Sequence, residues 1–298
     1  MLWLATAELA SSVSNAGALG VISPLAGMKK GEDPSKNLTK QIVKTNKLTQ
    51  KPFGVNLPLD LPYVDVLIDT VLKEKVEIVI TAAGNPCDYS TLLKRKGITL
   101  LHVVSNVRQA KNAQLCKVDG VIAEGVEAAA HIGLDELPLF SLLPQVADNV
   151  SVPVVAAGGI ADARGLVAAM ALGAEGVQLG TRFVAVEENI AHMNYKRAIV
   201  EADDADTVIT CRKLIPTRSL KSSFSKRLIE YEKSDVTPKD LLDFIDYRSN
   251  RTAQIEGNMD GGEAYCGASA GLIKEIVPAA EVIQKLVEGY EHVLDTFF

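Results

Sequence analysis

The chain has 298 residues, 47% of them hydrophobic, and a formal net charge of −6. That length and apolar content suit one large domain, or one domain with an insertion, around a sizeable core. A mildly acidic chain with no extended Lys/Arg cluster is a poor match for nucleic acid or an anionic membrane, so we expect neither as a partner.

Four cysteines and four histidines are spread along the chain, and the cysteines form no CxxC pair. We therefore expect neither a disulfide framework nor a metal site, and a reducing cytoplasm is the expected location. The apolar first residues lack the basic start of a signal peptide and fit a buried helix better. No apolar run reaches about 18 residues, so we expect no membrane span.

Strand, loop and helix alternate along the first 183 residues. Apolar, β-branched runs predict strands at about 18–23, 53–58, 77–83, 98–104, 120–125, 152–157 and 176–180. Helical spacing predicts helices at about 8–15, 29–50, 63–75, 89–96, 107–116 and 163–172, and within 134–150. This alternation predicts an α/β fold whose parallel sheet is covered on both faces.

The number of strands distinguishes two architectures. A (β/α)8 TIM barrel needs eight strands, whereas the sequence shows seven. The chain opens on what reads as the first helix, so we place the absent first strand before Met1. Glycine and polar residues at the ends of many strands suit the mouth of a barrel, and we favour the barrel over an open doubly wound sheet.

The pattern changes after Phe183. Residues 187–255 carry more charge and read as helices joined by loops, without a β repeat, which predicts a helical insertion or lid above the barrel mouth. A glycine-rich passage follows at 256–271, and a last helix at about 276–294 is expected to close the barrel. The predicted division is a barrel at 1–186, a lid at 187–255 and a closing segment at 256–298.

Two glycine turns lie one strand–helix unit apart, and both follow predicted strands. Gly158 and Gly159 end the first strand, and Gly180 and Thr181 end the second. Unhindered backbone N–H groups beside a helix start are what a bound phosphate needs. Either turn alone could be an ordinary connection, but the pair favours a phosphate site.

Three polar residues stand out near strand ends. His131 follows a strand, where an imidazole could transfer a proton near neutral pH, or it could be structural. The Asn56 amide could bind a planar heterocycle or cap a loop, and Gln178 needs a ligand or backbone partner. The basic cluster at 210–223 faces either solvent or an anion, and we favour solvent.

Five motifs, in this order and at these separations, resemble the nitronate monooxygenase (2-nitropropane dioxygenase) family. They are ATAELASSVSNAGALG, FGVNLP, AEGVEAAAHIG, AAGGIADARGL and GAEGVQLGTRF. That family includes flavin-dependent enoyl-acyl-carrier-protein reductases and NADH:quinone reductases. The resemblance implies a (β/α)8 barrel that binds FMN without a covalent link.

The resemblance also implies roles for individual residues. It places the FMN phosphate at the two glycine turns and makes His131 the catalytic histidine. Further flavin contacts are implied for Asn56, Glu124, Ala129 and Gln178. The family usually has Gly-Gly before this histidine, whereas this chain has Ala129-Ala130, and it usually begins with a strand ending in Gly-Gly-Met.

Three functions follow from the resemblance. The first is oxidation of an alkyl nitronate, with dioxygen reoxidising the flavin. The second is NAD(P)H-dependent reduction of an enoyl thioester or a quinone. The third is a degenerate flavin-binding protein without catalysis, which the two alanines and the absent strand motivate. In each enzymatic case the partner is a small-molecule substrate, and a homodimer is left open.

Overall fold

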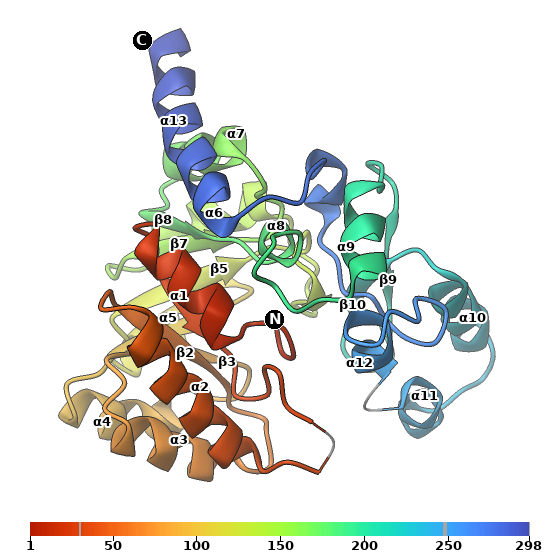
Figure 1. Cartoon of the computed structure of the whole chain (residues 1–298), viewed down its shortest axis with the longest axis horizontal. Helices are drawn as coiled ribbons and strands as arrows, with labels where there is room; N and C mark the ends of the chain where they lie inside the picture. The colour runs from red at the N-terminus through yellow and green to blue at the C-terminus, as the bar shows by residue number, and fades with distance from the viewer. Residues whose placement is uncertain (30, 247–248, 298) are drawn as a thin grey trace.

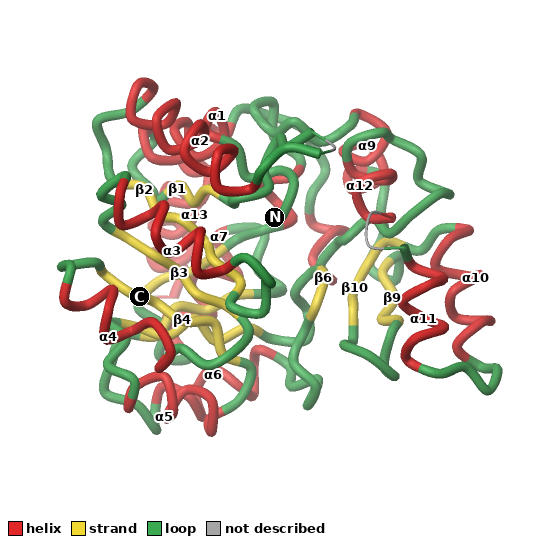
Figure 2. The backbone as a smooth tube through the Cα atoms, turned by 90° about the horizontal axis from the view of Figure 1, so that it is seen from below, coloured by secondary structure: helices red, strands yellow, loops and turns green. Residues whose placement is uncertain are grey.

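The computed structural model describes residues 1–29, 31–246 and 249–297. Its central feature is a curled parallel sheet with the strand order β1-β2-β3-β4-β5-β7-β8 (Figures 1 and 2). The strands are β1 (Gly20–Ile22), β2 (Phe53–Pro58), β3 (Ile78–Ala82), β4 (Thr99–Val104), β5 (Gly120–Glu124), β7 (Val154–Ala157) and β8 (Gly176–Gln178). All seven predicted strands are therefore confirmed, and β1 and β8 form the two edges of the described sheet.

Both faces of the sheet are apolar, which explains why the strands lack polar alternation. On the concave face, Ile80, Ile122 and Val155 pack together. On the convex face, Val55, Val79 and other alternate residues pack against the helices. Burial on both faces is typical of the parallel sheets in α/β proteins.

Helices cover the convex face, and α13 completes this layer. They are α1 (Ala7–Asn15), α2 (Pro34–Leu48), α3 (Val64–Lys73), α4 (Cys87–Arg95), α5 (Val107–Leu115), α6 (Leu139–Ala147), α7 (Ala163–Ala171) and α13 (Ala279–Phe297). The last of these contacts both α1 and α7. Leu9 and Val13 of α1 pack against Ile283 and Leu286 of α13. These contacts place α13 against α1 and α7, and its role in closing the barrel remains a prediction.

A second, smaller sheet stands beside the first (Figure 2). It is antiparallel with the order β6-β10-β9, formed by β6 (Ala130–His131), β10 (Thr217–Leu220) and β9 (Thr207–Thr210). Around it lie α8 (Thr181–Val184), α9 (Met193–Val200), α10 (Ser223–Glu232), α11 (Pro238–Ile245), α12 (Ser249–Gln254) and the 3-10 helix η1 (Ala268–Leu272). The prediction that 187–255 lacks strands was wrong, because four-residue strands are too short to show a clear alternation.

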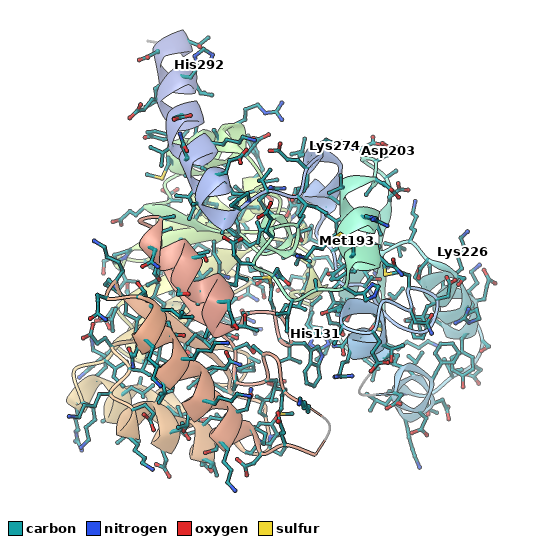
Figure 3. The ribbon with its side chains drawn as sticks, in the orientation of Figure 1. His131, Met193, Asp203, Lys226, Lys274 and His292 are labelled. Carbon is teal, nitrogen blue, oxygen red and sulfur yellow. A yellow bond between two sulfur atoms is a disulfide. The ribbon has the colours of Figure 1, made fainter. Side chains whose placement is uncertain are left out.

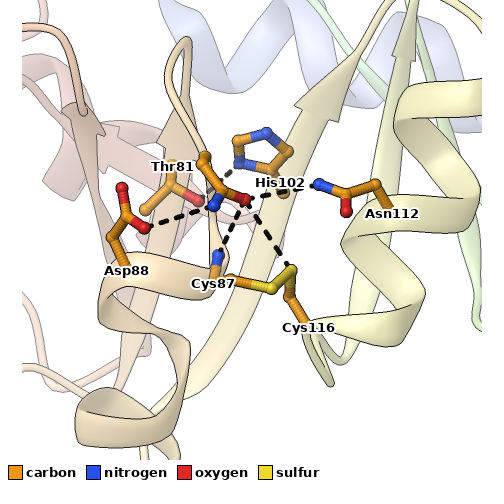
Figure 4. Close-up of a disulfide and its surroundings, with 7 residues drawn as sticks. Thr81, Cys87, Asp88, His102, Asn112 and Cys116 are labelled. Carbon is orange, nitrogen blue, oxygen red and sulfur yellow. Dashed lines mark hydrogen bonds between the residues drawn. A yellow bond between two sulfur atoms is a disulfide. The ribbon is translucent and has the colours of Figure 1, made fainter.

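One disulfide joins Cys87, at the start of α4, to Cys116, just after α5 (Figure 4). Their Cα atoms are 4.7 Å apart although 29 residues separate them in sequence. The side chain of Asn85 accepts hydrogen bonds from the Cys87 backbone and from Asn112 beside this link. The expectation of no disulfides was wrong because the fold, rather than a short spacing motif, brings the two cysteines together.

The described helices include none that is long and apolar enough to cross a membrane. The predicted boundaries at 186 and 255 remain predictions. Two contacts cross them: β6 pairs with β10, and Trp3 packs in the same apolar cluster as Ala253 and Ala264. The predicted barrel and the predicted lid therefore share both a sheet and a core.

Candidate active site

Three polar side chains point into the curl of the large sheet. Residues paired in register on neighbouring parallel strands face the same way. Asn56 pairs with the inward-facing Ile80. Glu124 pairs with Ala157, which faces inward and pairs in turn with Gln178. Asn56, Glu124 and Gln178 therefore share the concave face, as a common ligand would require.

These three groups have few partners within the protein. The Asn56 side-chain amide donates to the Ile80 carbonyl at 3.3 Å. The side chain of Gln178 has no hydrogen-bond partner among the described residues. Burial raises the pKa of Glu124 to about 7, so that its carboxyl group is easily protonated near neutral pH. Incompletely satisfied polar groups at the carboxyl ends of barrel strands are typical of ligand sites.

The glycine turn after β7 needs glycine at both positions. Gly158 and Gly159 have φ angles of +93° and +73°, in the left-handed region. A Cβ on Gly158 would lie 3.0 Å from the backbone nitrogen of Ala128. The turn therefore requires bare backbone, and in the described chain the Gly159 N–H donates to no protein group.

The turn after β8 is open where the first is crowded. A Cβ on Gly180 would meet nothing within 4 Å, and no described residue accepts a hydrogen bond from its N–H. The next residue, Thr181, is buried, and its hydroxyl accepts a hydrogen bond from the Gly267 N–H at 2.9 Å. The Thr181 hydroxyl is thus tied to the glycine-rich passage, while the Gly180 N–H stays available for a ligand.

His131 lies in β6, the edge strand of the smaller sheet on the side nearest the large sheet (Figure 2). It ends β6 and pairs with Thr217 of β10, so the lid sheet holds the backbone of the histidine. His131 is exposed to solvent on one side. Desolvation by the surrounding protein nevertheless lowers the pKa of His131, and the nearby Asp60 carboxylate partly opposes this shift. An imidazole with a lowered pKa is neutral near pH 7 and can accept a proton.

The two alanines before His131 differ in conformation. Ala130 has a φ of +65°, a region that glycine enters freely and alanine rarely does. Ala129 lies against the glycine-rich passage, because a Cβ on Gly267 would lie 3.6 Å from its nitrogen. The backbone here is therefore one that suits the Gly-Gly usual in the family, and Ala130 adopts it with strain.

The basic cluster at 210–223 is divided between solvent and the site. Arg212 pairs with Glu136 in an exposed bidentate contact, as the solvent-facing interpretation predicts. Arg218 does not fit that interpretation. It is half-buried, and its Nε donates to the Val126 carbonyl at 2.9 Å, in the loop that leads to His131. Its place at the centre of a short, unrecognised strand hid this inward orientation.

A model of the nitronate monooxygenase family matches residues 1–289. This chain belongs to that family. It is 31% identical over 313 residues to a probable nitronate monooxygenase of Staphylococcus haemolyticus, covering 90% of this chain and 86% of the relative. Membership makes the chain an oxidoreductase of a flavin-enzyme family.

Solved structures extend the comparison. FabK of Thermotoga maritima superposes with a TM-score of 0.93 at 40% identity, covering 100% of this chain and 92% of that one. Nitroalkane oxidase of Streptomyces ansochromogenes superposes with a TM-score of 0.86 at 25% identity, covering 99% and 95%. Both are TIM barrels, so the curled sheet of this family member is a TIM-barrel sheet.

Proposed function

We propose that this protein is an FMN-dependent nitronate monooxygenase that oxidises alkyl nitronates with dioxygen. The observation that carries the proposal is that backbone N–H donors at two glycine turns and polar side chains on the concave face lie together at the carboxyl ends of the strands. Among the described residues, the backbone N–H groups of Gly159 and Gly180 have no acceptor, and the side chain of Gln178 on the concave face has no hydrogen-bond partner. His131 follows Ala129 by two residues. A Cβ on Gly267 would lie 3.2 Å from the Thr181 hydroxyl and 3.6 Å from the Ala129 nitrogen, which brings the segment before His131 close to the turn after β8.

The residues present fit FMN. Gly158, Gly159, Gly180 and Thr181 would hold the phosphate, because bare backbone allows close approach and free N–H groups donate to phosphate oxygens. Asn56, Glu124, Ala129 and Gln178 would contact the rest of the cofactor. Side-chain amides on the concave face offer both donors and acceptors, which a heterocyclic ring requires.

When bound, FMN supplies the electron transfer, whereas the protein places and polarises the substrate. His131 would donate a hydrogen bond to the nitronate oxygens and stabilise their negative charge, because a nitronate is already deprotonated and has no acidic proton to give up. Its lowered pKa leaves the imidazole neutral at pH 7, with one ring N–H to donate. Glu124, with a pKa of about 7, would hold a proton at the end of β5 on the concave face.

The test is oxygen uptake by FMN-loaded protein on addition of ethyl nitronate or propionate-3-nitronate. We expect uptake by the wild type and a loss of turnover in His131→Asn with flavin retained. His292→Asn, on the far end of α13, is the matched control and should keep full activity (Figure 3). Flavin-loaded wild type that consumes no oxygen contradicts nitronate oxidation.

A second candidate is NAD(P)H-dependent reduction of an enoyl thioester or a quinone. The identity to FabK is higher than the identity to the Staphylococcus haemolyticus relative, which favours the reductase. Anaerobic mixing with NADH separates the two, because only a reductase bleaches the flavin rapidly. A colourless protein that takes up no FMN would instead favour the degenerate, non-catalytic alternative. The cytoplasmic location and a homodimer remain predictions.

A further inference from the structure

The ring of Tyr265 lies beside His131. Their ring centroids are 6.4 Å apart, and the ring planes are tilted by 54°. Two residues further along, the Gly267 N–H binds the Thr181 hydroxyl. This segment therefore runs from His131 to the glycine turn after β8, along the side of the candidate site. A ligand that extends from that turn to His131 passes Tyr265.

The backbone at Tyr265 is held in place from two sides. It forms an antiparallel bridge with Ser219 of β10, and the neighbouring Ala264 carbonyl accepts a hydrogen bond from the Leu220 N–H at 2.8 Å. The Tyr195 hydroxyl donates to the Tyr265 carbonyl. A glycine-rich passage would ordinarily be free to move, but here it is fixed where the tyrosine stands.

The hydroxyl of Tyr265 is held as well. It donates to Glu263 Oε2 at 3.3 Å and also bonds the Asn250 side chain. Asn250 in turn accepts from the Trp3 indole at 3.0 Å. Both ends of the tyrosine are thus anchored in the lid, and the ring cannot swing away from His131 without breaking these bonds.

Glu263 is an unusual anchor. Its side chain is only 3% exposed, and none of the ion pairs in the described chain includes it. A buried carboxyl group without a cation is unfavourable for folding. The side-chain groups it satisfies are the hydroxyls of Tyr265 and Thr210, the latter at 3.5 Å. Its side chain therefore links the Tyr265 hydroxyl to Thr210 of β9.

We propose that Tyr265 is a specificity-determining residue of this site. Its anchored ring forms a rigid wall beside His131 that admits flat, conjugated reacting groups and excludes bulky ones. This inference rests on the proposed function, because it takes His131 as the group that meets the substrate. A fixed aromatic face stacks favourably on a flat conjugated group, at little entropic cost since the ring is already ordered.

The experiment compares Tyr265→Ala and Tyr265→Phe with wild type in FMN-loaded protein. Tyr231→Ala is the matched control, because that tyrosine stacks on Phe244 elsewhere in the lid, with ring centroids 4.8 Å apart. The first readout is the dissociation constant of benzoate, a flat conjugated anion, measured from the flavin spectrum. The second is the kcat/KM ratio for cyclohexyl nitronate over ethyl nitronate.

We expect Tyr265→Ala to weaken benzoate binding about tenfold and to raise the nitronate ratio about tenfold, with FMN affinity unchanged. Tyr265→Phe keeps the ring but loses the anchor, so its values should lie between. Tyr231→Ala should match the wild type. If Tyr265→Ala does not fold, Tyr265→Phe tests the proposal instead. We then expect the benzoate dissociation constant and the nitronate kcat/KM ratio each to rise about threefold.

Equal benzoate affinities and equal nitronate ratios in wild type and both Tyr265 variants overturn the inference while leaving the proposed function standing. Conversely, a wild type that binds FMN but oxidises neither nitronate refutes nitronate oxidation. If the Tyr265→Ala variant then binds benzoate more weakly than this wild type, the result still supports Tyr265 as a wall of the site. Wild type that binds no FMN overturns both.

Discussion

Replacing Glu263 with glutamine should make the protein more stable at alkaline pH. Burial raises the pKa of Glu263 from 4.5 to about 7. Because the folded protein holds this proton more tightly than the unfolded chain, stability from the neutral acid is fully present below about pH 4.5 and is lost as pH rises towards 7. Glutamine keeps the shape and has no proton to lose, so Glu263→Gln removes this loss.

The size of the effect follows from the shift in pKa. A shift from 4.5 to about 7 corresponds to about 3 kcal/mol when the group is ionised. Glu263 is 3% exposed, so solvent screens little of it. Between pH 5 and pH 8, the unfolding free energy of Glu263→Gln should gain about 2 to 3 kcal/mol relative to wild type.

Urea unfolding at pH 5, 6.5 and 8 measures this difference. Glu230→Gln is the control, because the Glu230 side chain is 71% exposed and its substitution should show no such pH dependence. A stability difference between Glu263→Gln and wild type that stays constant from pH 5 to pH 8 would contradict a raised pKa for Glu263. It would mean that Glu263 is already ionised in the folded protein at pH 5.

Three further predictions concern the turns, the alanines and the disulfide. Gly158→Ala should raise the FMN dissociation constant at least tenfold, because φ is +93° and the new Cβ would meet backbone atoms. The control Gly176→Ala should leave the FMN dissociation constant unchanged, because its Cβ has room. Equal flavin affinity in the two variants contradicts the phosphate assignment. Ala130→Gly should raise the unfolding free energy by about 1 kcal/mol by relieving a φ of +65°; a less stable variant in urea unfolding argues against strain there. The disulfide between Cys87 and Cys116 spans 29 residues, and its reduction should lower the unfolding free energy by about 3 to 4 kcal/mol. Urea unfolding with and without reductant checks this, and Cys87→Ser should be insensitive to reductant; unchanged wild-type stability contradicts the prediction.

The barrel could be predicted because its signals are local. Each strand is a short apolar run, and each run is followed by a turn and a helix, so periodicity alone places the units. The two glycine turns were predictable for the same reason, since glycine at two successive strand ends is visible in the sequence; their phosphate binding remains a proposal. The placement of Asn56 and Gln178 followed from their positions on strands whose register the structure then supplied.

The lid could not be predicted in the same way. The strands β9 and β10 have four residues each, and β6 has two, so no alternation marks them. Tyr265 reaches His131 only through the pairing of its segment with β10, a tertiary contact. Glu263 carries no sequence signal at all, because a glutamate in a polar, glycine-rich passage is expected to be exposed.

Nitronate oxidation at this site is tested by oxygen uptake on adding ethyl nitronate to FMN-loaded wild type and to FMN-loaded His131→Asn. We expect uptake by the wild type, and at least a hundredfold slower uptake by the variant with its flavin spectrum intact. Wild-type protein that binds FMN and consumes no oxygen, or a His131→Asn variant that turns over at the wild-type rate, would contradict this expectation.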